Sequence, residues 1–225
     1  MQKLISGIHN FKEGLFRDER ELFERLSLGQ NPDVLFVTCS DSRIDPNALT
    51  GTQPGDLFVL RNAGNILPAY NGDPTAEAAT IEYAVSVLGV KDIVVCGHTH
   101  CGAMTALVKG GDRSAIPMVD GWLKNADATR RIVHENYADI DEGSQVRVAI
   151  QENVLMQIEN LRTHPSVAAA VARGGLGLHG WVYKIESGDV FSYDPGSGQF
   201  GAVKATPVVS RPRRLVDVEG VADGK

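Results

Sequence analysis

Two short motifs with metal-binding side chains each follow an apolar run. Cys39 comes directly after Val34–Thr38, and His98 and Cys101 come after Ile93–Cys96. Thiolate and imidazole are ligands that Zn²⁺ prefers, and three protein ligands are typical of a catalytic zinc site, which keeps its fourth position for water. The spacing of two residues between His98 and Cys101 allows one turn to present both side chains to the same ion. The sequence therefore predicts one zinc ion bound by Cys39, His98 and Cys101.

The same side chains allow other interpretations. A cysteine near a strand end is often only a small apolar residue, and we assign this structural role to Cys96. A closed structural zinc site with Asp41 as fourth ligand is a second alternative, and a redox-active thiol pair is a third. The redox pair is disfavoured because the chain has no Cys-x-x-Cys motif. His100 is not expected to bind the metal, because next to Cys101 it would have to point away from an ion held by His98.

A carboxylate and a guanidinium follow Cys39 closely. Asp41 lies two positions and Arg43 four positions beyond it, so a tight loop can place both beside the metal. An aspartate paired with an arginine stays ionised, and it can accept the proton of a zinc-bound hydroxide and so direct the oxygen lone pair at an electrophile. An ordinary capped loop is the alternative. If Asp41 instead binds zinc, the site is closed, and activity depends on whether Arg43 draws the carboxylate away.

The charges of the ligands predict the pH at which such a site works. Two thiolates cancel the charge of Zn²⁺, so water bound to the ion should be less acidic than at a site of three neutral histidines. The hydroxide form, and with it catalysis, is therefore expected to favour alkaline pH.

The apolar runs predict a parallel sheet that positions these motifs. The run Val34–Thr38 is almost continuously apolar, as is typical of a strand covered on both faces. Two more strands are predicted at Leu57–Leu60 and Ile93–Cys96, and a helix is predicted between them at Thr75–Leu88. Strand, helix, strand with short connections is a βαβ unit. Since ligands bind at the carboxyl ends of parallel strands, the metal site is expected at that edge.

Further elements are predicted from periodicity and from caps. An Asp73-Pro74 cap is expected to start the helix between the strands. Other helices are predicted at Pro46–Thr50, Cys101–Val108, Val119–Asn136, Ser144–Arg162 and Pro165–Arg173. The segments His179–Ile185 and Val190–Tyr193 are predicted to form a hairpin or a pair of edge strands. The fold class is thus α/β, with a mostly parallel central sheet flanked by helices and a C-terminal edge hairpin.

The first part of the chain predicts a helical arm. Between Leu4 and Leu26, apolar residues recur at spacings of three and four, as on one face of an amphipathic helix. This helix either covers the core of its own chain or reaches across a neighbouring subunit. We therefore expect a single domain over residues 1–225, with an N-terminal arm at 1–28 and an irregular C-terminal tail at 202–225.

Composition excludes several classes of function. A net charge of −6 in a chain of 225 residues argues against binding to nucleic acid and to anionic membrane surfaces. No apolar run approaches the roughly 18 residues of a membrane-spanning helix, and residues 1–10 lack the apolar core of a secretion signal. Three cysteines are an odd count that does not suit a disulfide framework. We therefore expect a cytoplasmic protein with no nucleic-acid or membrane partner.

With these motifs, the chain resembles the β-class carbonic anhydrases. The resemblance is carried by Cys39-x-Asp41-Ser42-Arg43, by His98-x-x-Cys101 and by the stretch at 61–65 between them. Similar flanking sequences occur at 54–59, 82–85 and 178–183, and the likeness runs from about residue 4 to about residue 200. Within the family, the chain is most similar to the plant-type branch, which includes bacterial enzymes encoded beside cyanate-degrading genes.

The resemblance implies an activity and an assembly. The implied reaction is the reversible hydration of CO₂ to bicarbonate and a proton, with zinc hydroxide as the nucleophile. It implies one Zn²⁺ per subunit on Cys39, His98 and Cys101, and a catalytic pair formed by Asp41 and Arg43. It also implies a homodimer whose N-terminal helices cross between subunits, or a larger homo-oligomer of four or eight chains.

The resemblance further implies a small substrate pocket. Gln30, nine positions before Cys39, would donate a hydrogen bond to the substrate, and the backbone amide of Gly102 would do the same. Three apolar residues would line the pocket, some of them from the adjacent subunit: Phe58, Ala63 and Tyr83. On the residues alone, Phe58 and Tyr83 could equally be core, and Gln30 could face solvent.

Phe36 lies at a position that differs between branches of the family. The bicarbonate-inhibited branch of the family carries Trp three residues before the first cysteine ligand, where this chain has Phe36. We therefore expect no allosteric bicarbonate site and an open zinc.

Some relatives with the same metal site hydrolyse carbonyl sulfide or carbon disulfide, which are linear and apolar like CO₂. A zinc-stabilised binding module without turnover is the alternative from a different class.

Overall fold

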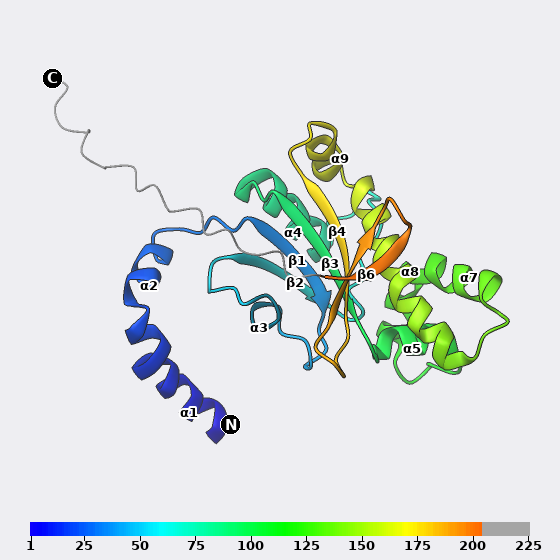
Figure 1. The fold of residues 1–225 in the computed structure, drawn as a ribbon, viewed down its shortest axis with the longest axis horizontal. Coiled ribbons are helices and arrows are strands. Elements are labelled where there is room, and N and C mark those ends of the chain that lie inside the picture. Colours follow the sequence, from blue (N-terminus) through cyan, green and yellow to red (C-terminus); the bar gives the residue numbers. More distant parts are fainter. Residues whose placement is uncertain (204–225) are drawn as a thin grey trace.

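The computed structural model describes residues 1–203, which contain one six-stranded β-sheet (Figure 1). In chain order the strands are β1 (Val34–Cys39), β2 (Leu57–Asn62), β3 (Asp92–His98), β4 (Gly177–Tyr183), β5 (Val190–Asp194) and β6 (Gln199–Ala202). They lie in the order β2-β1-β3-β4-β5-β6. The first four are parallel to one another, β5 pairs antiparallel with β4, and β6 pairs antiparallel with β5. The predicted α/β fold with a mostly parallel sheet is confirmed.

Strands β1 and β3 lie next to each other in the middle of the sheet. Five of the six residues of β1 and six of the seven of β3 are buried, as expected for parallel strands covered on both faces. In the register, Cys39 lies opposite Asn62 of β2, and Thr38 lies opposite Cys96 of β3. The carboxyl ends of all three strands therefore reach the same edge of the sheet.

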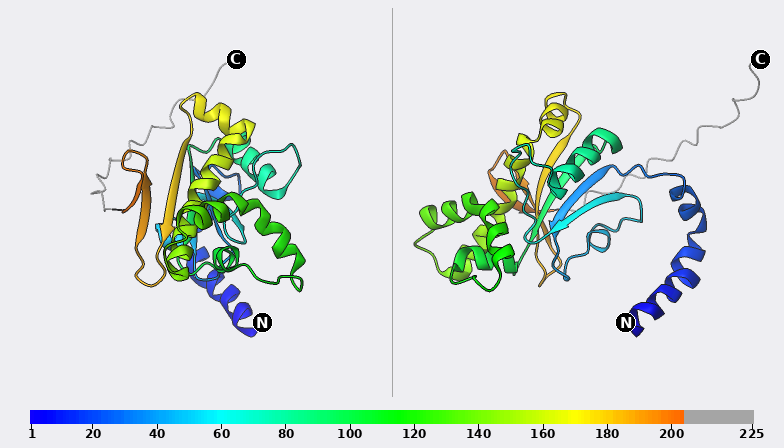
Figure 2. Two further views of the ribbon diagram at one scale, coloured as in Figure 1. Left: turned by 90° about the vertical axis from the view of Figure 1, so that its right-hand side faces the viewer. Right: turned by 180° about the vertical axis from the view of Figure 1, so that it is seen from behind.

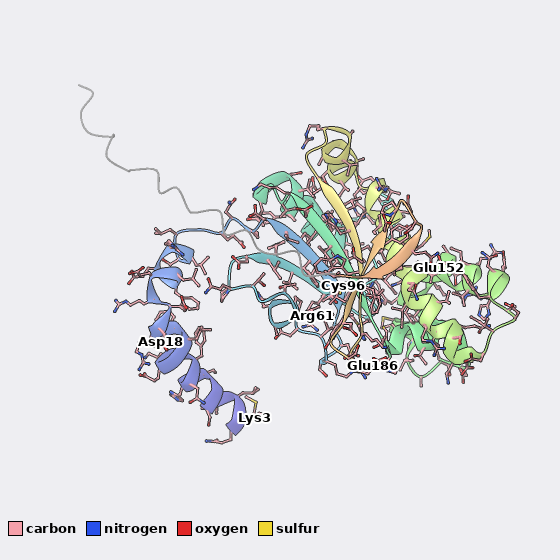
Figure 3. All side chains as sticks on the ribbon, in the orientation of Figure 1. Lys3, Asp18, Arg61, Cys96, Glu152 and Glu186 are labelled. Atoms are coloured by element: carbon pink, nitrogen blue, oxygen red, sulfur yellow. The ribbon has the colours of Figure 1, made fainter. Side chains whose placement is uncertain are left out.

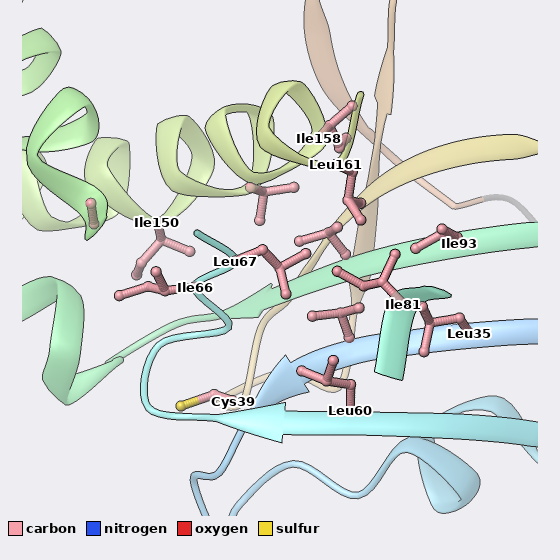
Figure 4. Packing of buried hydrophobic residues seen from close by; sticks show 14 of the residues in the cluster. Leu35, Cys39, Leu60, Ile66, Leu67, Ile81, Ile93, Ile150, Ile158 and Leu161 are labelled. Atoms are coloured by element: carbon pink, nitrogen blue, oxygen red, sulfur yellow. The ribbon is translucent and has the colours of Figure 1, made fainter. Parts of the chain in front are cut away.

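Most helices lie on one face of the sheet (Figure 2), and the short helix α3 (Pro46–Thr50) packs on the other face. The other helices around the sheet are α4 (Ala76–Tyr83), α5 (Gly102–Lys109), α6 (Pro117–Leu123), α7 (Asp127–Asn136), α8 (Glu142–Thr163) and α9 (Pro165–Ala172). The main core lies on the face that carries Leu35 and Ile93, where residues of α4, α5, α8 and α9 pack (Figure 4). On the opposite face, Phe36 and Val94 pack with Leu49 of α3.

The N-terminal arm extends away from the sheet, and its residues Lys3 and Asp18 lie far from Cys96 in the sheet (Figure 3). The arm consists of α1 (Gln2–Phe11), the π-helical turn η1 (Lys12–Phe16) and α2 (Arg20–Leu26). Three aromatic side chains pack against one another within the arm: Phe11, Phe16 and Phe23. No residue of these three elements is buried against the described part of the chain.

Three predicted helices have different boundaries in the structure. The arm is interrupted at Glu19, whose backbone leaves the helical conformation. The helix predicted over 119–136 is divided by the short 3-10 turn η3 (Lys124–Ala126). The helix after β2 is capped by Thr75 instead of Asp73, because the Thr75 side chain accepts the hydrogen bond of Ala78 N–H. That helix ends in the π-helical turn η2 (Ala84–Leu88).

The C-terminal part differs from the prediction as well. The irregular tail was expected to begin at residue 202, but Ala202 belongs to β6 and pairs with Phe191 of β5. The predicted tail beyond residue 203 lies outside the described residues. Within residues 1–203, no helix combines the length and the apolar character that crossing a membrane requires.

Candidate metal centre

Cys39, His98 and Cys101 meet at the carboxyl edge of the sheet. Cys39 ends β1, His98 ends β3, and Cys101 directly precedes α5. Their sulfur and ring nitrogen atoms all lie within 4.8 Å of one another, and the residues are 6%, 0% and 1% exposed. Because β1 and β3 are parallel neighbours, two strand ends that are remote in sequence are adjacent in space. The predicted convergence of the three side chains is present.

The donor atoms of this cluster fit a zinc ion. The Nδ1 atom of His98 is paired with the carbonyl oxygen of Thr99 at 2.8 Å, which directs Nε2 toward the cysteines. That Nε2 atom is buried and has no hydrogen-bond partner among the described residues. Two sulfurs and one imidazole nitrogen are a soft donor set that Zn²⁺ takes in tetrahedral sites. Burying an unpaired polar atom is costly, so a bound cation would satisfy it.

The surroundings of the two thiols favour a negative charge within the cluster. The nearby Cys101 thiol and His98 ring, together with the hydrogen bond from the Gly64 N–H, outweigh burial and lower the pKa of Cys39. The same contact with Cys39 raises the pKa of Cys101, because a second thiolate would lie beside the first. Burial opposes a charge on His98, but the Cys39 sulfur raises the pKa of the imidazole. A divalent cation would allow both sulfurs to ionise.

Asp41 and Arg43 form a close pair next to this cluster. Arg43 donates from Nε to Oδ1 of Asp41 at 2.9 Å and from Nη2 to Oδ2 at 2.7 Å, and its backbone N–H also donates to Oδ1. Arg43 Nη2 further donates to the carbonyl oxygen of His100. The hydrogen bond from Arg43 holds the pKa of Asp41 well below its usual range. Asp41 Oδ2 lies 3.8 Å from Nε2 of His98, so an ionised carboxylate faces the Cys39, His98 and Cys101 cluster.

Arg61 holds the loop that carries Asp41, a role that sequence reasoning did not assign. From β2, its guanidinium donates to the carbonyl oxygens of Cys39, Asp41 and Ile44 at 2.7 to 3.0 Å. The available signal was its place in the stretch 61–65, which lies between the two metal-binding motifs. Residue type alone did not reveal it, because its partners are backbone atoms.

Two further residues near the cluster, Cys96 and His100, were not expected to bind the metal, and both are directed as predicted. Cys96 is fully buried within β3, and burial raises the pKa of its thiol to about 12, which fits a structural residue. His100 has a positive φ of 58°, and its exposed ring lies 3.5 Å from the carboxylate of Glu186. Its ring is therefore directed away from the cluster.

The comparisons with known proteins agree with this geometry. Residues 34–190 match the family model described as carbonic anhydrase. The chain is 49% identical over 195 residues to a carbonic anhydrase from Synechocystis sp., covering 86% of this chain and 71% of that protein. It is similar to the structure of the β-carbonic anhydrase CcaA, with a TM-score of 0.88 and 48% identity over 90% of this chain and 99% of that one. The chain belongs to the β-class carbonic anhydrases.

A second solved structure is informative about assembly. One of two tetrameric β-carbonic anhydrases from Sordaria macrospora matches this carbonic anhydrase with a TM-score of 0.76 and 33% identity, over 85% of this chain and 95% of that one. That protein is described as a tetramer.

The residues predicted to bind substrate are divided between two parts of this carbonic anhydrase. Ala63 precedes Gly64, whose N–H contacts the Cys39 sulfur, and Gly102 directly follows Cys101, so both lie at the cluster. The other three do not reach it within one chain: Phe58, Tyr83 and Gln30. Phe58 and Tyr83 contact each other, with ring centroids 6.0 Å apart. Phe58 lies four residues before the end of β2, about 13 Å along the strand from the metal-binding edge. Gln30 is exposed and precedes β1, at the opposite edge of the sheet.

Phe36, by contrast, is firmly part of the core. It is 1% exposed, and its ring packs edge to face on Trp181 at a centroid distance of 6.1 Å. The expectation that this position binds no bicarbonate stays a prediction.

Proposed function

We propose that this carbonic anhydrase interconverts CO₂ and bicarbonate with one Zn²⁺ per chain, held by Cys39, His98 and Cys101. The observation that carries the proposal is the buried cluster of three soft donor atoms, with His98 Nε2 left without another partner. When bound, zinc supplies a Lewis acid that lowers the pKa of water, so that a nucleophile forms at a pH well below the one that free water requires.

In this proposal, Asp41 and Arg43 orient the reacting water. Arg43 uses two nitrogen atoms to hold both oxygens of Asp41, so the carboxylate stays ionised and fixed in position. Oδ2 of Asp41 faces the ligand cluster and can accept a hydrogen bond from the reacting water, which would direct a lone pair at CO₂. The pairing with Arg43 also favours a site in which Asp41 does not bind the metal.

The substrate pocket requires more than one chain in this proposal. CO₂ carries no charge and no donor, so a small dry pocket suits it. One chain leaves Phe58, Tyr83 and Gln30 away from its own metal ligands, and it leaves Leu4 and Ile8 of the arm 63% and 67% exposed. A homodimer, or a larger assembly built from it, would bury the arm and bring the three residues to a neighbouring site. Three buried free cysteines, two of them ligands, favour a reducing compartment such as the cytoplasm.

The experiment that tests the proposal joins metal analysis with rate measurements. The purified protein should contain one zinc per chain and should hydrate CO₂ at a rate that rises from pH 7 to pH 9, because two thiolate ligands keep the reacting water weakly acidic. Carbonyl sulfide is assayed in parallel. Turnover of carbonyl sulfide with negligible CO₂ hydration would overturn the proposal, and so would stoichiometric zinc without either activity.

A further inference from the structure

The turn after β2 provides a hydrogen bond to a metal ligand. The backbone N–H of Gly64 donates to the sulfur of Cys39 at 3.3 Å in a buried position. Gly64 has a φ of +84°, and a Cβ atom built on it would lie 2.8 Å from Cβ of Ala103. Only glycine takes this conformation in this space without strain. The turn is therefore shaped so that this N–H faces the sulfur.

Trp122 holds the other end of the same peptide unit. Its indole Nε1–H donates to the carbonyl oxygen of Ala63 at 2.8 Å. The Ala63 carbonyl and the Gly64 N–H belong to one planar peptide, so a hydrogen bond to the oxygen restricts the direction of the N–H. Hydrogen bonds in a chain also polarise one another, which strengthens the bond to the sulfur. Trp122 thus acts on Cys39 through a single peptide group.

The next peptide unit is held from α8. Asn153 Nδ2 donates to the carbonyl oxygen of Gly64 at 3.0 Å, and Gln157 Nε2 donates to Oδ1 of Asn153 at 2.9 Å. Gln157 Oε1 accepts the N–H of Leu67 at 2.8 Å. Asn153 and Gln157 are 1% and 0% exposed. This pair also satisfies the buried backbone of the fold, whereas Trp122 is only half-buried and contacts the turn from α6.

We propose that Trp122 is a positioning residue of the metal centre: through the Ala63–Gly64 peptide it maintains the N–H···S hydrogen bond to Cys39, slows the loss of the metal and tunes the sulfur as an electron donor. The inference rests on the proposed zinc site. Losing a group that is hydrogen-bonded directly to a metal ligand typically changes metal affinity or activity by roughly 10- to 100-fold. Trp122 acts through one such group, the Gly64 N–H, so an effect at the lower end of that range is expected.

The test compares two variants that each lose one indole N–H. Trp122→Phe removes the donor to Ala63, and Trp181→Phe is the matched control, because Trp181 packs on Phe36 on the other face of the sheet. Zinc release from the holoenzyme into excess chelator should be about 10-fold faster in Trp122→Phe and unchanged within about twofold in Trp181→Phe. In the cobalt-substituted protein, the sulfur-to-metal absorption band should move to longer wavelength in Trp122→Phe alone.

A third variant separates positioning from packing. Trp122→His keeps a ring N–H that can reach the Ala63 carbonyl, so it should restore most of the slow release and of the band position. Release from Trp122→Phe at the wild-type rate with an unmoved band would overturn the inference and leave the zinc proposal intact. Equal failure of Trp122→Phe and Trp122→His would show that the indole acts by packing, which overturns the inference too. A wild-type protein without stoichiometric metal would overturn both proposals.

Discussion

The metal-binding edge of the sheet and the N-terminal arm differ in how far their side chains are buried within one chain. At the edge, the side chains of Cys39, His98 and Cys101 are buried, and the backbone around them is hydrogen-bonded within the chain. In the arm, apolar side chains such as Leu4 and Ile8 are mostly exposed. The first region is buried within a single chain, whereas the second exposes an apolar surface of the kind that marks an interaction site.

This difference predicts which substitutions act within one chain and which act through a second chain. Loss of a ligand should affect each chain independently of any partner. Loss of the arm's apolar contacts should instead leave the ligands in place and remove only what a second copy adds. The expected effects therefore decrease from the ligands, through Asp41, to the arm.

The largest effect is expected from removing a ligand. Cys39→Ser or His98→Ala should lose zinc and reduce CO₂ hydration by more than about 100-fold, since a ligand matters more than the partners around it. Metal content by atomic emission and rate by stopped flow are the measurements. Cys96→Ala is the matched control, because Cys96 is equally buried but lies outside the cluster. A zinc-loaded Cys39→Ser protein would contradict the ligand set.

A large effect with a different signature is expected at Asp41. Asp41→Ala should keep one zinc per chain and lose about 100-fold or more in rate, because the carboxylate that orients the reacting water is gone. Asp41→Asn, which keeps the shape but not the charge, should be nearly as slow. Loss of zinc from Asp41→Ala would show that the carboxylate binds the metal, and the open-site proposal would fail.

The convergence of Cys39, His98 and Cys101 was predictable because the relevant signal is local. Cys39 and His98 each end an apolar run, and parallel strands bring such ends together regardless of their separation in sequence. The strands β1 and β3 follow from the same runs. The Asp41–Arg43 pair is local as well, since two residues in one tight loop contact each other directly.

The missed features depend on contacts between distant residues. Trp122 bonds to Ala63 and Asn153 bonds to Gly64, and nothing in either neighbourhood marks an indole or an amide as a partner of a remote carbonyl. Strand β6 was missed because Gly201 weakens its strand pattern, and pairing with β5 overrides that weakness. The break near Lys124–Ala126 has a different, local cause: the Asn125 side chain donates to the carbonyl oxygen of Trp122, three residues earlier.

A moderate effect is expected in the arm. Ile8→Asp should weaken self-association by about 10-fold or more, because it places a charge in the surface that a second copy would cover. Zinc content should be unchanged, and CO₂ hydration should fall at concentrations where the variant is monomeric. Ser6→Asp adds the same charge two residues earlier, off the apolar stripe, and should behave like the wild type. Sedimentation and rate measured on the same dilution series decide the outcome, and an active monomer would refute a shared pocket.

The smallest effect is expected in the pH dependence of stability. Arg43 lowers the pKa of Asp41 below its ordinary value of 3.8, so the folded protein releases this proton more readily than the unfolded chain. The stabilisation is therefore fully present above pH 3.8 and declines as the pH falls further toward the lowered pKa. Half of the Arg43 side chain is exposed, so solvent screening keeps the effect small. In metal-free protein, the stability difference between wild type and Asp41→Asn, measured by urea unfolding, should be constant from pH 7 to pH 5 and should shrink below about pH 4. A stability difference that grows on acidification would mean that Arg43 does not hold the carboxylate in its charged form. The contacts within one chain would then fix the metal-binding edge less firmly than the comparison with the arm implies.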